Sequence, residues 1–200
     1  MTNKREGRKK PFLVILEGAH GAGKGTISTA IRNRITCTNL ISLSGLPIDS
    51  SKELVFNTRA SELDMLFDIR KSKLNIVMDR SFMSDRVFQI LGKKPYSAHD
   101  FDTFYNSLIN KLEKLKQFYN IKLVMLSADK EEYIRRHKAR ANKPQYENLE
   151  LTAEHSMIQQ GIYLDVMCEV SAKAHIDFIN INTGAPKERT INKVLEFIEG

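Results

Sequence analysis

Residues 12–26 read FLVILEGAHGAGKGT and join an apolar run to a glycine-rich turn. The apolar run, residues 12–16, has the length and composition of a strand that is buried on both faces. Gly18, Gly23 and Lys24 fit the spacing G-x-x-x-x-G-K, and residues 26–35 contain no Gly or Pro and can continue as a helix. Glycines allow positive φ angles, so successive backbone N–H groups and the helix N-terminus can point at one anion. We therefore expect this turn to be a phosphate-binding loop.

The side chains of the loop indicate how it binds a nucleotide. Lys24 supplies a mobile positive charge that can follow a phosphoryl group during transfer. Gly25 stands where the common loop has the Ser or Thr that ligates magnesium, so we expect a metal ion to be held more through water. The alternative is a glycine-rich turn that binds nothing, which requires strand, lysine and helix to coincide by chance. The expected ATP-binding residues are Gly18, Ala19, His20, Gly21, Ala22, Gly23, Lys24, Gly25 and Thr26.

Length and composition favour one soluble domain. The 200 residues are 42% hydrophobic, which suffices for a single core, so one domain is expected over residues 11–200. No apolar run has the length of a membrane span and the N-terminus lacks a secretory signal, so a cytoplasmic protein without a membrane partner is expected. Residues 1–10 carry part of the net charge of +7 and read as a disordered basic tail. The remaining positive charge suits a nucleotide or a nucleic acid, although a solvated surface would look the same.

Strand-like segments alternate with helical segments five times. The expected strands cover residues 12–16, 39–43, 74–78, 121–126 and 176–181. The expected helices cover residues 26–35, 52–71, 81–91, 100–119, 129–140 and 151–174, and a last helix follows residue 186. Gly161 is a point at which the helix over residues 151–174 could break. This alternation predicts an α/β fold with a five-stranded parallel sheet, helices on both faces and a ligand crevice at the carboxyl ends of the strands.

A second informative stretch, NIVMDRSFMSDRVFQ, covers residues 75–89. Asp79 ends a predicted buried strand, where a carboxylate can hold magnesium through water or take a proton from an attacking oxygen. Arg80 follows it and can clamp a phosphate with two hydrogen bonds. The alternative is that Asp79 caps the next helix and Arg80 is a surface charge. We expect both residues to be catalytic, together with Lys24.

The two stretches together resemble the thymidylate kinase and deoxynucleoside kinase superfamily. Thymidylate kinases carry EGxDGxGK[ST]T and DR[YH]xxSxxAxQ, whereas deoxynucleoside kinases carry EGNIGxGKST and ERSxxSDRxxF. The residues that match the first segment are Asp79, Ser84 and Gln89, and those that match the second are Ser81, Asp85 and Arg86. The resemblance covers about residues 11–200. It implies a P-loop kinase fold with a short lid, ATP and magnesium as cofactors and, because related kinases are commonly dimers, a homodimer.

The resemblance also implies residues that bind the acceptor. Phe56 and Arg59 lie about twenty residues before Asp79, where thymidylate kinases have an aromatic residue that stacks on the base and an arginine that bonds its edge, although the spacing here is one residue shorter. Tyr146 and Glu147 lie in QYEN, which is similar to the RYEN of the thymidylate kinase lid. Tyr146 would then pack against the deoxyribose and Glu147 would orient groups near the phosphates.

Elementary chemistry points to an overlapping set of residues. A nucleobase needs an aromatic face and a few polar edges, and these residue types recur around Asp79. For the two phenylalanines in the set, core packing is an equal alternative. The expected substrate-binding residues are Phe56, Arg59, Arg80, Ser84, Arg86, Phe88, Gln89, Tyr146 and Glu147.

A basic cluster precedes the polar segment around residue 145. Phosphoryl transfer needs positive charge around the transferring group, often delivered by a lid that also excludes water. Arg136 and Arg140 match the R-x-x-x-R of the lid in the resembled family, so we expect them to be catalytic and the lid to cover about residues 136–149. A solvated helix face is the alternative for each of these residues.

These patterns lead to a kinase that uses ATP to phosphorylate a deoxynucleoside monophosphate, with a thymidylate-like pyrimidine as the expected acceptor. His20 replaces the Asp that contacts the sugar in thymidylate kinases, and SGLPI at residues 44–48 replaces their E-P-G-G or E-P-V element. These two departures leave the identity of the acceptor open. A deoxynucleoside kinase, with Asp79 as base and Arg86 near the nucleobase, is the nearest alternative. A nucleic-acid kinase and a nucleotide-binding regulator without turnover are further alternatives, and nucleic acid is not the expected partner.

Overall fold

Five parallel strands form the centre of the computed structural model, which describes residues 10–42, 45–141 and 152–200. The strands lie side by side in the order β2-β3-β1-β4-β5. Their bounds are β1 Phe12–Glu17, β2 Thr38–Ser42, β3 Asn75–Asp79, β4 Asn120–Ser127 and β5 Asp177–Asn182. The expected five-stranded parallel sheet is therefore confirmed, with strand ends within two residues of the expected ones.

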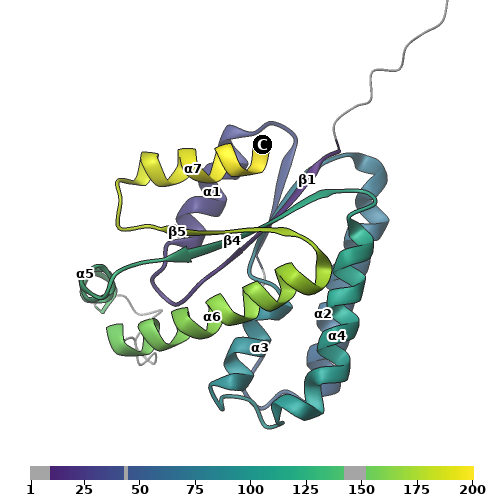
Figure 1. Cartoon of the computed structure of the whole chain (residues 1–200), viewed down its shortest axis with the longest axis horizontal. Helices are drawn as coiled ribbons and strands as arrows, with labels where there is room; N and C mark the ends of the chain where they lie inside the picture. The colour runs from purple at the N-terminus through teal and green to yellow at the C-terminus, as the bar shows by residue number, and fades with distance from the viewer. Residues whose placement is uncertain (1–9, 43–44, 142–151) are drawn as a thin grey trace, which may run out of the picture.

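Helices cover both faces of this sheet (Figure 1). α1 and α7 lie on one face, and α2, α3, α4 and α6 lie on the other. The bounds are α1 Lys24–Arg34, α2 Lys52–Ile69 with the 3-10 turn Arg70–Ser72, α3 Phe82–Ile90, α4 Ala98–Leu115, α5 Lys130–Arg140, α6 Ala153–Ala174 and α7 Lys187–Glu199. The expected α/β architecture with helices on both faces is confirmed.

The sheet separates two hydrophobic cores, and β1 contributes side chains to both. Leu13 and Ile15 point into the core beneath α2, α3, α4 and α6, whereas Val14 and Leu16 point into the core beneath α1 and α7. All four side chains are fully buried, which is why β1 reads as an unbroken apolar run and not as an alternating one. The pairing of Leu16 with Asp79 in β3 brings the segment after β1 next to the segment after β3.

α6 is continuous at Gly161, the point at which the sequence allowed a break. The helix runs without a break from Ala153 to Ala174, although a glycine inside a helix costs about 1 kcal/mol relative to alanine. The buried residues Tyr163, Met167 and Val170 attach the following turns to the core and keep the helix continuous. Gly161 itself is exposed, with no atom within 4 Å of the position its Cβ would take.

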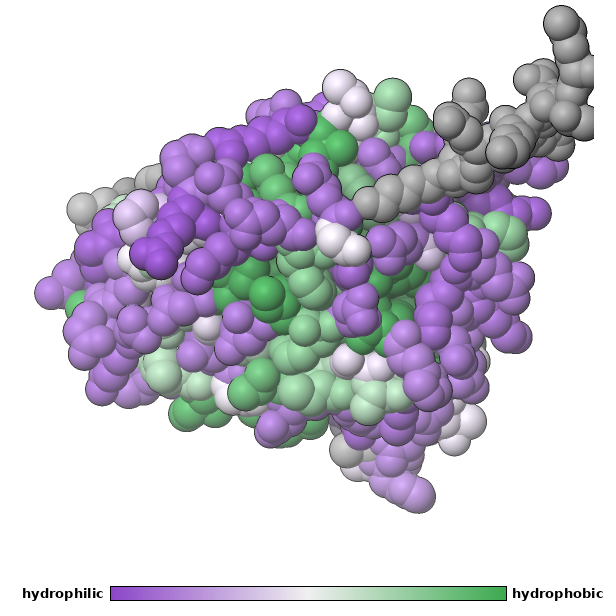
Figure 2. All heavy atoms as spheres, turned by 45° about the horizontal axis from the view of Figure 1, so that its top comes forward, coloured by the Kyte–Doolittle hydropathy of each residue, from purple (hydrophilic) through white to green (hydrophobic). Residues whose placement is uncertain are grey.

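The outer surface carries the polar side of these helices. On the face shown in Figure 2, hydrophilic side chains cover most of the area, and apolar side chains gather near its centre and along its lower edge. Within the described part of the chain, none of the helices combines the length and apolarity that a bilayer span needs.

Candidate active site

The turn between β1 and α1 has the backbone of a phosphate-binding loop. Gly18, Gly21 and Gly23 have φ angles of 147°, 88° and 96°, in the region that favours glycine. α1 begins at Lys24, so its first N–H groups open toward the loop. Lys24 Nζ lies inside the turn and donates to the carbonyl oxygens of Gly18, at 2.5 Å, and Ala19, at 2.9 Å.

Lys24 is a buried cation beside other positive charges. Burial, and after it the charge of Arg80, lowers the pKa of the Lys24 ammonium to about 7. The carboxylates of Glu17 and Asp79 act in the opposite direction. The lowered pKa favours the uncharged amine, so Lys24 can take up a proton when an anion enters the loop.

If ATP binds in the loop as the sequence predicts, its binding at about pH 8 should take up a proton, because a triphosphate stabilises the charged ammonium and raises its pKa. Affinity for ATP should consequently fall as pH rises above about 7. Calorimetric titrations in two buffers of different ionisation enthalpy measure the uptake. The Lys24→Met variant is the control and should show less uptake than the wild type. Equal binding enthalpies of the wild type in both buffers would contradict the expectation.

Asp79 ends β3 beside the loop. Its Oδ2 accepts a hydrogen bond of 3.3 Å from the buried hydroxyl of Ser28, which sequence reasoning did not single out. The same oxygen lies 3.7 Å from the position that a Cβ on Gly25 would take. The residue after Lys24 thus lacks a hydroxyl here, and a carboxylate stands next to that position.

Arg80 follows Asp79 in a conformation that side chains other than glycine rarely adopt. Its φ is 80°, which costs of the order of 1–3 kcal/mol for a non-glycine residue and persists where the surroundings hold it. The N–H of Arg80 donates to the Leu16 carbonyl at 3.0 Å and extends the β1–β3 pairing. The guanidinium contacts the hydroxyls of Tyr163, at 3.2 Å, and Ser84, at 3.4 Å.

Glu17, the last residue of β1, is fully buried and was also missed by sequence reasoning. It accepts hydrogen bonds from the hydroxyls of Ser81, at 2.8 Å, and Ser84, at 2.7 Å. Burial raises the pKa of the Glu17 carboxyl, and the bond from Ser84 and the charge of Arg80 oppose that rise. Its position in the EG that opens the glycine-rich turn was the only available signal.

Three hollows lie along the carboxyl ends of the strands. The central hollow, about 460 Å³, is lined by His20, Gly21, Gly23, Lys24, Gly25, Thr26, Ser42, Asp79, Arg80 and Arg140. The Phe88 hollow, about 370 Å³, is lined by His20, Gly45, Leu46, Ile48, Arg59, Arg80, Ser84, Asp85, Phe88, Leu91, Lys93, Lys94, His155 and Gln159. The Thr183 hollow, about 590 Å³, is lined by Gly21, Gly23, Thr26, Ile27, Glu132, Arg135, Arg136, Arg140, Thr183, Gly184, Ala185, Pro186, Lys187 and Thr190.

The central hollow shares residues with both of the others. His20 and Arg80 also line the Phe88 hollow, and Gly21, Gly23, Thr26 and Arg140 also line the Thr183 hollow. A glycine-rich loop at the carboxyl ends of parallel strands, with one cavity on each side, can hold two ligands whose polar ends meet at the loop.

Solved structures of similar shape carry the same architecture. A YorR protein from Bacillus subtilis, solved in complex with phosphorylated GDP, is 17% identical, with a TM-score of 0.64 over 94% of this chain and 95% of its own. Deoxyadenosine kinase from M. mycoides with bound dATP is 17% identical, with a TM-score of 0.57 over 94% of this chain and 100% of its own. Thymidylate kinase from Candida albicans is 14% identical, with a TM-score of 0.57 over 95% of this chain and 92% of its own. The chain has the P-loop kinase fold. Neither a protein-family model nor a curated protein sequence matches it.

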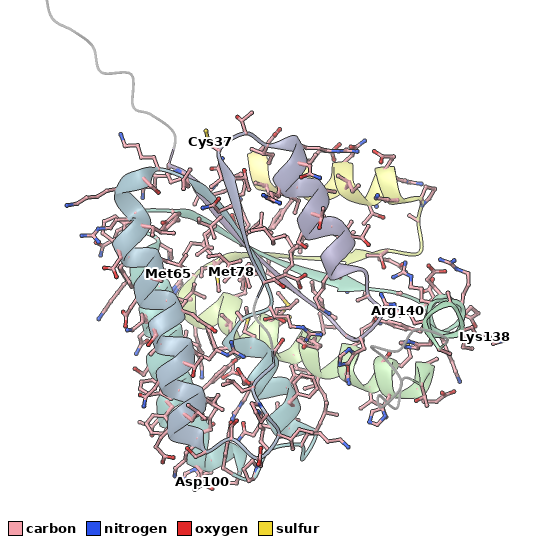
Figure 3. The ribbon with its side chains drawn as sticks, turned by 180° about the vertical axis from the view of Figure 1, so that it is seen from behind. Cys37, Met65, Met78, Asp100, Lys138 and Arg140 are labelled. Atoms are coloured by element: carbon pink, nitrogen blue, oxygen red, sulfur yellow. The ribbon has the colours of Figure 1, made fainter. Side chains whose placement is uncertain are left out.

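In this P-loop kinase fold, α5 carries the two arginines expected to close over a phosphoryl group. Arg140 lines both the central and the Thr183 hollows, and Figure 3 shows it on the opposite side of α5 from Lys138. Arg136 is held in place: its guanidinium donates to Glu132 at 2.6 Å, to the Gly21 carbonyl at 2.8 Å, and to Thr183 at 2.7 and 2.9 Å. Arg136 therefore ties the loop to the segment after β5.

Some of the residues expected to bind the acceptor line the same hollow. Arg59, Arg80, Ser84 and Phe88 all line the Phe88 hollow. Arg59 Nε donates to the carboxylate of Asp85 at 2.6 Å, and this pair is almost fully buried.

Other residues expected to bind the acceptor do not line the Phe88 hollow. The ring of Phe56 stacks on Phe104 at 4.7 Å and does not line the hollow. Arg86 pairs with Asp102 at 2.8 Å and donates to Gln89 at 2.9 Å, and neither Arg86 nor Gln89 lines the hollow. Tyr146 and Glu147, residues 142–149 of the expected lid and residues 1–9 of the expected tail lie outside the described residues.

His20 connects the loop of the P-loop kinase fold to α6. Its N–H donates to Gln159 Oε1 at 3.2 Å, and its carbonyl accepts from the Ser156 hydroxyl at 3.0 Å. Burial, followed by the charges of Arg80 and Lys24, lowers the pKa of the His20 imidazole to about 3. The imidazole is therefore neutral near pH 7. It lines both the central and the Phe88 hollows and adds no negative charge to either.

Proposed function

We propose that this protein transfers the γ-phosphoryl group of ATP to a deoxynucleoside monophosphate, with a thymidylate-like pyrimidine as the expected acceptor. The observation that carries the proposal is the central hollow at the phosphate-binding loop, which shares lining residues with both the Phe88 hollow and the Thr183 hollow. A nucleotide hydrolase needs one nucleotide cavity and a water, whereas a kinase needs two cavities that meet at the transferred group.

ATP is assigned to the Thr183 side. The base would lie between α5 and residues 183–187, and the phosphates would extend into the central hollow over Gly21, Gly23 and the start of α1. Arg136 and its bonds to Thr183 keep the two walls of that cavity at a fixed separation. Lys24 and Arg140 would then meet the terminal phosphates.

The acceptor is assigned to the Phe88 side. Its walls offer the ring of Phe88 for a base, and the buried pair of Arg59 and Asp85 offers donors and acceptors for the polar edge of that base. The cations of the lining are Arg59, Arg80, Lys93 and Lys94, and the carboxylate of the lining is that of Asp85. This balance favours an acceptor that carries a phosphate over an uncharged nucleoside.

Transfer requires the attacking oxygen and the γ-phosphoryl group to meet in line inside a field of positive charge. Arg80, at the border of the central and Phe88 hollows, would bind the acceptor phosphate, and Lys24 and Arg140 would stabilise the charge on the transferred group. Magnesium commonly keeps several waters and binds one or two carboxylates besides substrate phosphates, and Asp79 beside the loop fits that pattern. When bound, the ion would supply charge neutralisation between the phosphates.

A deoxynucleoside kinase is the second candidate, and one observation favours it. Asp79 lines the central hollow with its carboxylate held by Ser28, so it could accept the proton of an attacking 5′-hydroxyl. A phosphate acceptor is already deprotonated and needs no such base. The two candidates therefore predict different acceptors, a monophosphate for the first and an uncharged nucleoside for the second.

Labelled ATP, magnesium and a panel of nucleosides, deoxynucleoside monophosphates and oligonucleotides test the proposal. Monophosphates are expected to be labelled and nucleosides and oligonucleotides to stay unlabelled. Labelling of nucleosides alone would establish the second candidate in its place. Labelling of oligonucleotide ends would indicate a nucleic-acid kinase, and ATP binding without any labelled acceptor would indicate a regulator; either result overturns the proposal.

A further inference from the structure

Arg80 is attached to a chain of hydroxyl groups that ends at a buried carboxylate. Its Nη1 lies 3.2 Å from the Tyr163 hydroxyl and 3.4 Å from Ser84 Oγ. The two hydroxyl oxygens lie 2.9 Å apart, and Ser84 Oγ lies 2.7 Å from Oε2 of Glu17. The turn after β3 and the elements α6, α3 and β1 each contribute one of these residues.

The proton count fixes the direction of this chain. The two serine hydroxyls and the charges of Arg80 and Lys24 favour the ionised form of Glu17, in which each carboxylate oxygen accepts one hydrogen bond. Ser84 donates its single proton to Glu17. In the hydrogen bond between the two hydroxyls, Ser84 is therefore the acceptor and Tyr163 the donor. Tyr163 then gives its proton to Ser84, and a lone pair on its oxygen remains to accept from Arg80 Nη1. Every hydroxyl is therefore needed in one orientation to hold the guanidinium.

Burial makes this arrangement rigid. Glu17 and Tyr163 are both 0% exposed and Ser84 is 5% exposed, so water cannot replace a lost partner easily. Burial also raises the pKa of the Tyr163 hydroxyl, which keeps its proton available for Ser84. Hydrogen bonds at such low local dielectric are strong, and a member left without its partner is costly.

We propose that Tyr163 is a positioning residue for the acceptor: with Ser84 and Glu17, it fixes the Arg80 guanidinium at the border of the central and Phe88 hollows. The proposal rests on the proposed function, in which Arg80 binds the acceptor phosphate. A guanidinium ordered in advance loses less conformational entropy when the acceptor arrives. Ser84 then acts through Arg80, because its hydroxyl is already engaged with Glu17 and Tyr163.

Tyr163→Phe removes one hydroxyl and retains the buried ring. It is expected to raise the KM for the monophosphate labelled in the acceptor panel by roughly 10-fold, while the KM for ATP changes by less than about 2-fold. The matched control is Tyr119→Phe, which also removes one buried hydroxyl, bonded to the Leu66 carbonyl at 3.1 Å on the opposite end of the sheet. It should leave both constants unchanged. An equal rise in both constants for Tyr163→Phe would overturn the proposal.

A second measurement does not depend on turnover. Side-chain ¹⁵N NMR of arginine reports rotation of the guanidinium, and the Arg80 signal can be assigned by its loss in Arg80→Lys. Rotation is expected to be slow in the wild type and in Tyr119→Phe, and fast in Tyr163→Phe. Unchanged slow rotation in Tyr163→Phe would overturn the positioning role. If no acceptor is labelled at all, the proposed function fails, and this measurement still decides whether Tyr163 holds Arg80. Ser84→Ala provides the same test if Tyr163→Phe does not fold.

Discussion

Replacing Lys24 with alanine is expected to lower kcat for phosphoryl transfer by about 10²–10³-fold, the loss typical when one preorganised donor to developing charge is removed. The ammonium lies inside the loop, where it bonds two loop carbonyls and lines the central hollow. Without it, the loop would lose the ammonium, and charge on the transferred group would be met by Arg140, the loop N–H groups and a bound magnesium ion. Turnover with the acceptor labelled in the panel, together with a melting curve that shows a folded protein, provides the measurement.

Two further variants separate charge from position. Lys24→Arg keeps a positive charge, but its planar guanidinium does not reproduce a compact ammonium between the Gly18 and Ala19 carbonyls, so activity should stay low. Lys138→Ala removes an exposed lysine from the opposite side of α5 and should leave kcat unchanged (Figure 3). Turnover of Lys24→Ala within about 10-fold of the wild type would remove the loop lysine from the mechanism.

The sequence predicted the fold because its signals are local. The apolar run of β1, the glycine spacing and the helix after it lie within a few residues of one another. One short stretch of sequence therefore predicts the strand, the turn and the helix together. The alternation of strands and helices then leaves few topologies, since parallel strands need right-handed crossovers. Asp79 and Arg80 could be located at the loop for the same reason: they end a strand of that sheet.

The remaining contacts of the site have no local signal. Tyr163 reaches Arg80 from 83 residues further along the chain, and on its own helix it looks like any buried aromatic residue. Thr183, which holds Arg136, lies 47 residues beyond it in the segment after β5. Phe56 shows the converse: an aromatic residue on a half-buried helix face suits a base or a core equally, and here its ring stacks on Phe104.

Replacing Gly18 with alanine is expected to destabilise the protein by about 3 kcal/mol or more, a large effect for a single methyl group. The φ of Gly18 is 147°, and a Cβ there would lie 2.3 Å from the carbonyl oxygen of Leu126 in β4. That oxygen belongs to a central strand paired on both sides, so it cannot move aside as a flexible side chain would. Urea denaturation of both proteins, analysed by linear extrapolation, measures the loss in free energy of unfolding.

Gly92→Ala is the matched control, because it separates the cost of a positive φ from the cost of the clash. Gly92 has a φ of 68° with no atom within 4 Å of its Cβ position, so alanine there should cost only about 1–2 kcal/mol. The excess loss in Gly18→Ala then measures how closely the loop packs on β4. An equal loss of stability in the two variants would show that the loop can shift away from the sheet. The short distance between Gly18 and Leu126 would then not be what fixes the position of the phosphate-binding turn.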